Sequence, residues 1–396
     1  MAQHTLKPDV AFARKLAENG GDSLKKCYQC ATCAVACPMA PANAPYPRKE
    51  MVWASWGLKD RLLSDVDLWL CHNCGNCSEL CPRGAKPADV MSAARSAVYQ
   101  NLVEPKCIGK MMGSVSGLMA LFAIPALLWL AVWYIRAGCN GGEWFPRAAD
   151  GKIVFGQIFY GDYTIDPIFM LTFFGAVFIL LRGVTKLWRM FRPEGQTMVL
   201  GRTKPWFRHV VDVICEEVIT GRKFGECSGS GAQAGGNPAG GRRLGHTELA
   251  WGFIILACVT ALVAVGHWGG KVIPAISIET PMPPAFPVKI LANFGAILLL
   301  AGLALLTARN MRLDKKKHSM SLRDWYPLLV IWLVTVTGIL AQCFRLADAI
   351  KPAFVVYYLH LVFVWMLFAY LPWSRLGHIV YRTAALVYAR MYGRGS

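Results

Sequence analysis

The sequence is poor in charged residues, and acidic residues are the scarcer kind. Charged residues make up 17 % of the 396 positions and hydrophobic residues 55 %, a balance too apolar for a purely soluble protein. Only 24 acidic residues stand against 42 lysines and arginines, which gives a formal net charge of +18. In so apolar a chain, this excess indicates basic loops held against an anionic membrane. We therefore expect lipid, and no nucleic acid, as a partner.

Residues 1–20 lack an apolar run. A secretory signal needs such a run, so we expect this end of the chain to stay in the cytoplasm. Cysteines, by contrast, are plentiful: the chain has 14 of them, and most fall into two tight groups near the N-terminus. Clustered cysteines in a reducing compartment indicate metal binding and argue against disulfides.

Six apolar runs follow residue 110, and each is long enough to cross about 30 Å of hydrocarbon. They lie at about 113–136, 166–188, 247–268, 286–308, 325–347 and 353–376. Lysine and arginine are frequent in the connections 189–246 and 309–324 and rarer in the other three connections. This positive-inside pattern predicts a multi-pass protein of the inner (cytoplasmic) membrane with both termini in the cytoplasm.

The sequence therefore predicts an all-α fold with two domains. Residues 1–110 form a cytoplasmic helical domain, and residues 111–396 form a six-helix transmembrane bundle. The long connection between the second and third runs contains a candidate amphipathic helix at 206–220. A stretch rich in Gly, Ser and Ala then predicts a flexible cytoplasmic linker at 228–245.

The two cysteine groups share one spacing, in which three cysteines three positions apart precede a fourth cysteine and a proline. The first group is Cys27, Cys30, Cys33 and Cys37, and the second is Cys71, Cys74, Cys77 and Cys81. In two-cluster ferredoxins the first three cysteines of such a motif hold one [4Fe–4S] cluster and the fourth ligates the other. The spacing therefore predicts a helical ferredoxin-like domain with two interleaved clusters. Cluster one takes Cys27, Cys30, Cys33 and Cys81, and cluster two takes Cys71, Cys74, Cys77 and Cys37.

Zinc is the alternative metal, because sets of four cysteines also bind zinc. Zinc sites usually use pairs of cysteines, so the repeated run of four before a proline favours clusters. The sequence lacks a Cys-x-x-Cys-His motif, which excludes covalent c-type haem. The six scattered cysteines are expected to be small hydrophobes or free thiols. His72, inside the second motif, could tune the cluster potential or bind metal, but we expect it to be an exposed neighbour of the cluster.

Four histidines fall at the ends of two apolar runs, where ionisable residues are costly and by default functional. On one continuous helix, His360 and His378 would face the same way, about 27 Å apart. His246 and His267 border the third run and lie about 60° out of register. The topology pairs His267 with His360 near the outer surface and His246 with His378 near the cytoplasmic surface. These pairs predict an outer and an inner b-type haem, each held by two imidazoles.

Other interpretations of these residues stay open. A single histidine at a helix end would be read as interfacial, but four that match in depth and facing favour haem. His209 or His318, both in cytoplasmic loops, could replace His246 as the inner ligand. Arg375 and Arg382 near His378 are candidates for pairing with the propionates of the inner haem, or they anchor the chain at the membrane surface.

One segment of the last run resembles a known family. The stretch from Leu359 to Ile379, with Leu-His-Leu-Val at its start and Leu-Pro-Trp-Ser-Arg-Leu-Gly-His-Ile at its end, resembles the last haem-binding helix of the nitrate reductase gamma subunit family. Members of that family are membrane di-haem cytochromes b that react with quinol. Val265-Gly266-His267 resembles the end of the family's other haem helix. That helix carries a further histidine in the family where this sequence has Ala257, so His246 is the least secure ligand.

The same resemblance implies a quinone site. Pro287-Val288-Lys289 resembles the stretch where a lysine lies beside the outer haem and the quinol pocket. Gly266, His267 and Lys289 are therefore candidate quinone-binding residues. Lys289 either donates a hydrogen bond to a quinone carbonyl or a haem propionate, or its ammonium group extends to the outer lipid headgroups.

The N-terminal domain is similar to the C subunit of heterodisulfide reductases. The two parts together resemble the family of membrane C subunits of quinone-interacting membrane-bound oxidoreductase (Qmo) complexes. The resemblance implies an electron-transfer subunit of a quinone-linked oxidoreductase, with menaquinol as substrate. It also implies cytoplasmic flavin and Fe–S partner subunits, with adenylylsulfate reductase as a distant client in sulfate respiration. The absence of a Cys-Cys pair argues against the Cys-Cys-Gly ligand motif of heterodisulfide-reductase catalytic subunits, so we expect the soluble domain to conduct electrons only.

Two other functions stay open. An equivalent subunit of a heterodisulfide-reductase-like or sulfite-reducing complex would share the membrane chemistry and differ in its soluble partner. A transporter or anchor without redox chemistry would use the same histidines for protons.

Overall fold

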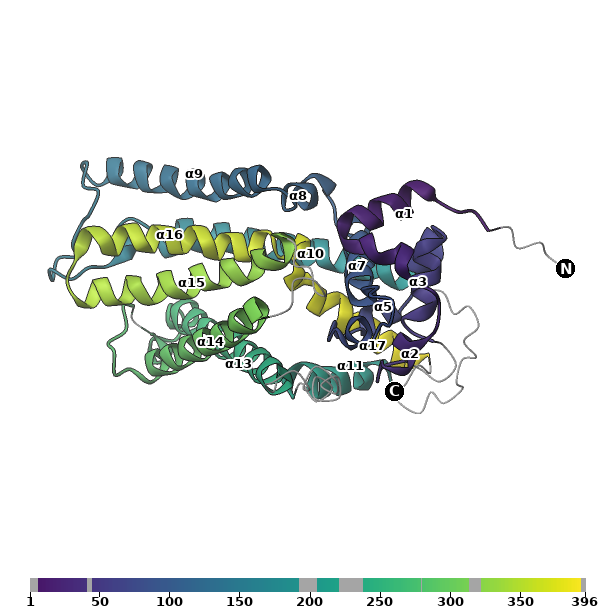
Figure 1. Cartoon of the computed structure of the whole chain (residues 1–396). Coiled ribbons are helices and arrows are strands. Elements are labelled where there is room, and N and C mark those ends of the chain that lie inside the picture. Colours follow the sequence, from purple (N-terminus) through teal and green to yellow (C-terminus); the bar gives the residue numbers. More distant parts are fainter. Residues whose placement is uncertain are drawn as a thin grey trace.

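The structure is a computed structural model of the chain that describes residues 6–40, 45–191, 205–220, 238–278, 280–312 and 322–392. Within these ranges every regular element is a helix and no strand is present, which confirms the predicted all-α fold. A group of short helices lies at one end, and long helices extend from it to the other end (Figure 1).

The N-terminal domain consists of short helices around one longer helix. Its elements are α1 (Val10–Leu16), η1 (Ala17–Gly21), η2 (Asp22–Lys26), α2 (Thr32–Val35), α3 (Arg48–Ser55), α4 (Lys59–Leu63), α5 (Asp67–Leu70), α6 (Asn76–Glu79), α7 (Pro87–Leu102) and α8 (Lys106–Met111). Helix α7 starts at a proline, which has no N–H to leave unpaired in the first turn. Val90, Ala94 and Val98 follow each other at helical spacing on its buried face, so α7 forms the centre of this domain.

A buried ion cluster lies between α3 and α5. The Lys49 ammonium is 3.1 Å from Glu50 Oε1, 3.2 Å from Asp65 Oδ2 and 2.7 Å from Asp67 Oδ2. All three carboxyl groups are buried, so one cation compensates three acids. Burial and the neighbouring Asp65 raise the pKa of Glu50 well above its ordinary value of 4.5.

Replacing Lys49 by methionine is therefore expected to destabilise the N-terminal domain. It leaves buried carboxyl groups without a counter-charge, which typically costs about 3–5 kcal/mol. The measurement is the thermal unfolding of the full chain, and Lys25→Met, on the exposed side of η2, is the control. Equal midpoints for the two variants would contradict the expectation.

The Glu50 carboxyl also predicts a pH dependence. Because its pKa is raised on folding, the folded state holds the proton more tightly than the unfolded state does. Stability is therefore lost as the pH rises from about 4.5, the unfolded value, through the raised folded pKa. Glu50→Gln should flatten this fall, and a pH series of unfolding midpoints would reveal it.

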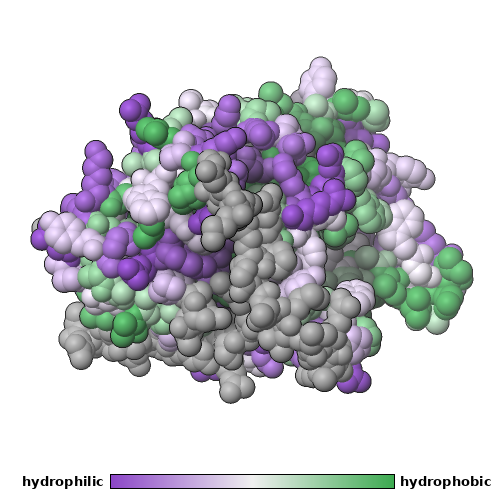
Figure 2. Space-filling model, turned by 90° about the vertical axis from the view of Figure 1, so that its right-hand side faces the viewer, coloured by the Kyte–Doolittle hydropathy of each residue, from purple (hydrophilic) through white to green (hydrophobic). Residues whose placement is uncertain are grey.

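Six helices in the described ranges are long and apolar enough to cross a membrane. They are α9 (Val115–Cys139), α10 (Asp166–Met190), α13 (Pro238–Ala264), α14 (Pro287–Arg312), α15 (Leu322–Leu346) and α16 (Ile350–Ala369). Each matches one predicted apolar run, and many of their large apolar side chains are exposed in the isolated chain, as expected for helices that face hydrocarbon. These helices indicate a multi-pass membrane protein. In Figure 2 the end that carries the N-terminal domain shows many hydrophilic residues, with hydrophobic residues gathered toward one edge.

The remaining elements are short or lie beside the bundle. They are η3 (Phe155–Gln157), η4 (Gly161–Ile165), α11 (Trp206–Val213), η5 (Ile214–Ile219), η7 (Val265–Gly269), η8 (Pro274–Ile276), η9 (Leu371–Trp373), η10 (Arg375–Gly377) and α17 (His378–Met391). Helix α11 with η5 confirms the helix predicted at 206–220. The predicted linker at 228–245 lies partly outside the described residues, and its end is wrong because α13 begins at Pro238.

The sixth span is shorter than predicted. Helix α16 ends at Ala369, and Pro372 follows in a 3-10 turn, because proline has no N–H for a continuing helix. His378 opens a separate helix, α17. The prediction that His360 and His378 share one straight helix at a spacing of five turns is therefore wrong.

Helices α13 and α14 pack closely because glycines line their contact. A Cβ on Gly302 would lie 2.7 Å from the carbonyl oxygen of Gly245, and a Cβ on Gly252 would lie 2.7 Å from Leu299 Cγ. Small residues let two membrane helices approach closely and gain dispersion contacts where the hydrophobic effect offers little. The third and fourth spans are thus a tightly packed antiparallel pair.

One hydrophobic core joins the N-terminal domain to the membrane helices. It contains Trp69 of α5 and Val98 of α7 together with Leu187 of α10 and Tyr381 of α17. The rings of Trp69 and Tyr381 have centroids 5.8 Å apart. A Cβ on Gly183 of α10 would clash with the Tyr381 hydroxyl, so glycine is needed there to admit the ring. The two domains therefore form one packed unit at this end of the bundle.

Candidate metal and cofactor sites

The structure brings the eight motif cysteines together in two interleaved sets. Cys33 lies within electrostatic range of Cys27, Cys30 and Cys81, and these four line one small cavity. Cys77 lies near Cys71, Cys74 and Cys37, and Cys33 of the other set acts on it more weakly. Cys37 in turn lies near Cys71 and Cys74. The fourth cysteine of each motif thus sits with the first three of the other motif. None of the eight forms a disulfide.

Left-handed turns shape both motifs in the same way. Gln29 and Ala31 in the first motif have φ of 60° and 66°, and Asn73 and Gly75 in the second have φ of 52° and 91°. These residues occupy equivalent positions, between the first and second and the second and third cysteines. Non-glycine residues rarely adopt this conformation, and such strain gathers at functional sites. Each turn returns the chain so that three thiols face one point.

The environment of the thiols fits a metal cluster. Gln29 Nε2 donates to Cys27 Sγ at 3.3 Å, and the Asn73 backbone N–H donates to Cys71 Sγ at 3.3 Å. Burial and the neighbouring cysteines raise the pKa of Cys33 to about 11, and burial raises the pKa of Cys37 to about 12. Four crowded thiols cannot all ionise without a cation, and a bound metal removes that barrier. Both sets therefore have the donor chemistry of a [4Fe–4S] site.

His72 is not the exposed neighbour that we expected. It is 4 % exposed, and Nη2 of Arg382 lies 3.0 Å from its Nδ1 and 2.9 Å from its Nε2. The expectation is wrong because α17 packs over the second motif. The other five described cysteines outside the motifs are free and exposed, and Cys227 lies outside the described residues.

The inner pair of histidines lies at the junction of the two domains. His378 is half-buried, and the charge of His246 acts on it. The His378 Nδ1 faces the backbone carbonyl of Arg375. This contact leaves Nε2 for a metal, which is the usual arrangement of a ligating histidine. His209 lies in α11, and His318 lies outside the described residues.

Arginines surround this inner pair. Arg382 and Arg95 both act electrostatically on His378. Arg375 donates to Ser92 Oγ at 2.7 Å and forms an ion pair with Asp324. Such guanidinium groups fit the carboxylates of haem propionates. The residues present therefore fit an inner b-type haem.

The outer pair is arranged differently. His360 lies on α16, and its Nδ1 is 3.0 Å from the Val334 carbonyl oxygen and 3.2 Å from Thr337 Oγ1. A Cβ on Gly338 would lie 2.9 Å from His360 Cε1, so this glycine gives the imidazole room against α15. As with His378, Nε2 is left for a metal.

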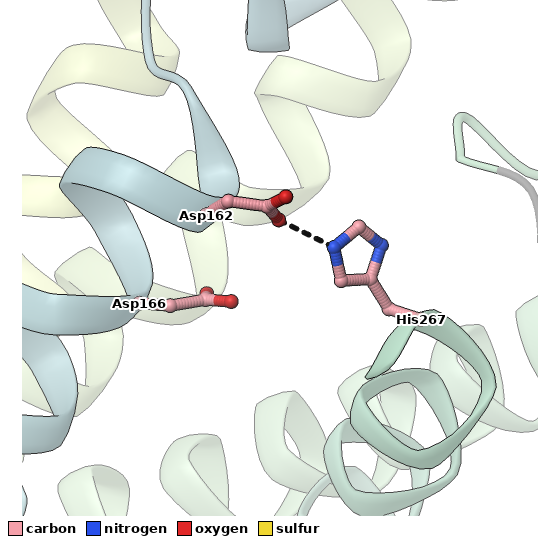
Figure 3. Close-up of side chains that lie close together, drawn as sticks. All are labelled: Asp162, Asp166 and His267. Atoms are coloured by element: carbon pink, nitrogen blue, oxygen red, sulfur yellow. Dashed lines mark hydrogen bonds and ion pairs between the residues drawn. The ribbon is translucent and has the colours of Figure 1, made fainter. Parts of the chain in front are cut away.

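His267 faces another partner. Its Nε2 is 2.5 Å from Asp162 Oδ1, and Lys271 Nζ is 2.5 Å from Asp162 Oδ2. Figure 3 shows His267 directed at Asp162, with Asp166 beside them. In the described part of the chain, no hydrogen bond or ring contact joins His267 to His360. A carboxylate that accepts from one ring nitrogen is a common support for a ligating histidine, so Asp162 fits that role with Nδ1 as the ligand atom.

The other quinone candidates lie nearby in the sequence and at the same end of the bundle. Gly266 is buried, and a Cβ there would lie 2.5 Å from Ile278 Cγ1. Lys289, in the first turn of α14, is half-buried and lies within electrostatic range of Arg345 of α15. Within the described residues neither cation pairs with a carboxylate. Two such cations fit an anionic or carbonyl-bearing ligand at this end.

Sequence reasoning missed several residues of these sites. Asp162 and Arg345 lie in other spans than the residues they face, and nothing in their local pattern marks them. Arg95 donates from Nη1 to the Cys71 carbonyl oxygen at 2.9 Å, a contact that depends on how α7 packs. Asp162 alone could have been suspected from the sequence, because it stands just before an apolar run and a carboxylate at a membrane boundary is costly.

These features define the class: an all-helical, multi-pass membrane protein with an N-terminal iron–sulfur domain. Residues 23–85 match the family model of the 4Fe-4S dicluster domain, and residues 164–395 match the model of Citrate utilization protein B. The second match covers more than half of the chain. The chain belongs to the Citrate utilization protein B family.

Several relatives match the iron–sulfur region alone. The C subunit of the H(2):CoB-CoM heterodisulfide,ferredoxin reductase of Methanothermobacter marburgensis is 43 % identical over 89 residues, 22 % of this chain and 48 % of that protein. A protein of Archaeoglobus profundus that is named as similar to the C subunit of heterodisulfide reductase is 33 % identical over 120 residues, 30 % of this chain and 61 % of that protein. The chain thus spans about half the length of these relatives, and they match its iron–sulfur region.

Citrate utilization protein B of Escherichia coli is similar over both domains. It is 25 % identical over 337 residues, which are 80 % of this chain and 80 % of that protein. No solved structure matches the chain significantly. The comparisons thus support an iron–sulfur subunit of an oxidoreductase that is attached to a membrane domain.

Proposed function

We propose that this chain is a membrane electron-transfer subunit that exchanges electrons between the menaquinone pool and cytoplasmic partner subunits. Two [4Fe–4S] clusters and two b-type haems carry the electrons in this proposal. The observation that carries it is the shared core of the iron–sulfur domain, α10 and α17. Helix α17 begins at His378 and packs over the second cysteine motif, so electrons can pass between the domains at this junction.

The ligands follow from the sites. Cluster one takes Cys27, Cys30, Cys33 and Cys81, and cluster two takes Cys71, Cys74, Cys77 and Cys37. The inner haem takes His246 and His378, and the outer haem takes His267 and His360. The orientation of the Nδ1 atoms of His360 and His378 toward backbone carbonyls supports ligation through Nε2. When bound, these groups supply one-electron transfer.

The chain's own residues would bind quinol and handle its protons at the outer end of the bundle. Lys289 can donate a hydrogen bond to a quinone carbonyl, and Gly266 lets Ile278 pack closely beside His267. Asp162 accepts from both His267 and Lys271, so it holds two proton-bearing groups where quinol oxidation would release protons. Basic residues at the opposite end, such as Arg182 and Arg189 of α10, support a cytoplasmic position for the iron–sulfur domain.

Lys289→Gln is expected to slow the reduction of the haems by a soluble menaquinol analogue. Loss of one charge-assisted hydrogen bond to the quinone corresponds to about tenfold in rate. Stopped-flow absorbance of the full chain measures it, with Lys351→Gln at the exposed start of α16 as the matched control. Equal rates in the two variants would show that Lys289 serves the lipid headgroups instead. No reduction of the native chain by menaquinol would defeat the quinone proposal itself.

The soluble partner is proposed from the resemblance to Qmo complexes: flavin and Fe–S subunits, with adenylylsulfate reductase as the client in sulfate respiration. An equivalent role beside a heterodisulfide-reductase-like complex is supported by the relatives of its iron–sulfur region. Co-purification of the native membrane complex distinguishes them, because the membrane chemistry is the same in both. A chain without haem or clusters would be a transporter or anchor.

A second candidate is favoured by the match to Citrate utilization protein B over both domains. In that case the same electron path would serve a soluble oxidoreductase in citrate use. The two candidates differ in which substrate reduces or oxidises the clusters of the intact complex. Identification of the soluble subunits that co-purify with the native chain separates them, because each substrate needs its own soluble partner.

A further inference from the structure

The junction between the two domains contains a short series of contacts from a cluster ligand to His378. His72 directly follows Cys71 and is buried. Arg382 contacts the ring nitrogens of His72 at 2.9 and 3.0 Å. Arg382 also lies one turn after His378 in α17, a rise of about 6 Å. The contact between His72 and Arg382 thus joins the residue after Cys71 to a residue one helical turn after His378.

A second arginine reaches the same place from α7. Arg95 Nη1 donates to the carbonyl oxygen of Cys71 at 2.9 Å, and its charge acts on His378. Tyr99, one turn further along α7, packs edge-on against Tyr381 of α17 at a centroid distance of 5.2 Å. Two guanidinium groups and an aromatic contact therefore lie at the junction between the second motif and α17.

The first motif has a different environment. Cys30 is exposed, and Tyr28 and Val35, which come before and after it in the sequence, are 67 % and 88 % exposed. Arg83 lies over the Tyr28 ring at 4.0 Å from its centroid and donates to its hydroxyl at 2.8 Å. This motif therefore presents an accessible surface away from α17.

We propose that cluster two is the cluster that exchanges electrons with the inner haem, that Arg382 and Arg95 are positioning residues for this step, and that cluster one faces the soluble partner. The inference rests on the proposed function, because it needs the inner haem. A guanidinium beside cluster two would stabilise the negative charge that one-electron reduction adds there, so Arg382 and Arg95 would raise the reduction potential of that cluster.

Arg382→Gln in the full chain, purified with its clusters and haems, tests the inference. The midpoint potential of one cluster should fall, and a tenfold loss in the equilibrium constant for its reduction corresponds to about 59 mV. Arg382→Lys keeps the charge and should restore most of the shift. Redox titration followed by electron paramagnetic resonance reads the two clusters separately, so the readout does not depend on activity.

A second variant identifies which signal belongs to which cluster. Gln29→Met removes the donor to Cys27 Sγ, and fewer hydrogen bonds to a cluster sulfur lower its potential. Gln29→Met should therefore shift only the signal that Arg382→Gln leaves unchanged. Arg390→Gln is the control on α17, because Arg390 pairs with Glu216 two turns beyond Arg382. It should move neither signal.

The outcomes are distinct. The inference would be overturned if Arg382→Gln and Gln29→Met shifted the same signal, or if Arg382→Gln shifted none. The proposed function would still stand in either case, provided that the haem spectrum is present. Absence of haem from the native chain would overturn both. If Arg382→Gln fails to assemble, Arg95→Gln takes its place, with the same expected shift of the cluster-two signal.

Discussion

Replacing Cys37 by alanine is expected to remove cluster two, although Cys37 belongs to the first motif. The structure places Cys37 with Cys71, Cys74 and Cys77, so its loss leaves that cluster with three thiolate ligands. Cys81→Ala should, by the same reasoning, remove cluster one. The iron content should fall from about eight to about four per chain in each variant, since each cluster holds four irons.

The interleaving is tested by which signal disappears. Cys37→Ala and Cys74→Ala should lose the same electron paramagnetic resonance signal, and Cys81→Ala and Cys30→Ala should lose the other. Cys107→Ala, which removes an exposed thiol in α8 outside the motifs, should keep both signals and the full iron content. If Cys37→Ala instead lost the signal lost in Cys30→Ala, each motif would hold its own cluster. Zinc in place of iron would defeat the cluster assignment altogether.

Most of the fold could be predicted from the cysteine spacing and the apolar runs. Six runs predicted six helices, because hydrocarbon thickness sets the length of a span whatever the helices pack against. Interleaving was predicted because the third spacing in each motif is too long to close the same cluster, and it stays a prediction. The structure places Cys81 near Cys33 and Cys37 near Cys77, as that prediction requires. Local spacing was informative here because each ligand set depends on neighbours in the chain.

Other features depend on tertiary packing and could not be predicted from the local sequence. The helical spacing placed His360 and His378 on one helix, but α16 ends before Pro372, and the chain turns there toward the iron–sulfur domain. That turn is what lets α17 cover the second motif and bury His72. The contact between His72 and Arg382 joins residues more than 300 positions apart, and no periodicity in either segment signals it.

The neighbours of the residues at the proposed outer site could not be predicted from the local sequence either. The sequence marked His267 and Lys289 by their position at span ends. Their observed neighbours, Asp162 and Arg345, come from the second and fifth spans. The position of these residues at the ends of spans was predictable from the sequence, but the direction in which each helix faces depends on which helices pack together.

His378→Ala is expected to halve the haem content and leave both clusters in place. His378 has its Nδ1 at a backbone carbonyl and lies near His246, so its loss would leave the proposed inner haem with His246 as its one remaining proposed ligand. A pyridine haemochrome assay should fall from about two haems per chain to about one, since each haem needs its own pair of imidazoles. Both cluster signals should persist, because no cysteine is altered. Survival of both haems would show that the ligand assignment is wrong.

The partner ligand can be tested in the same assay. His246→Ala should lose the same haem as His378→Ala, and His209→Ala, in α11, should keep both. If His209→Ala lost a haem and His246→Ala kept both, His209 would be the ligand in place of His246. The two histidines are well matched as a comparison, because both lie on the side of the bundle that carries the iron–sulfur domain.

The two proposed ligands of the outer haem can be tested separately, because His360 and His267 have different hydrogen-bond partners. His360→Ala should remove the outer haem, since its Nδ1 contact with Val334 leaves Nε2 for the iron. His267→Ala should remove the same haem only if Nδ1 of His267 is the second ligand. Asp162→Asn then separates the roles: it should retain the haem with a changed spectrum if Asp162 orients a ligating His267. If His267→Ala keeps two haems, the contact with Asp162 belongs to the proton-handling end of the quinone site, and the second outer ligand lies elsewhere.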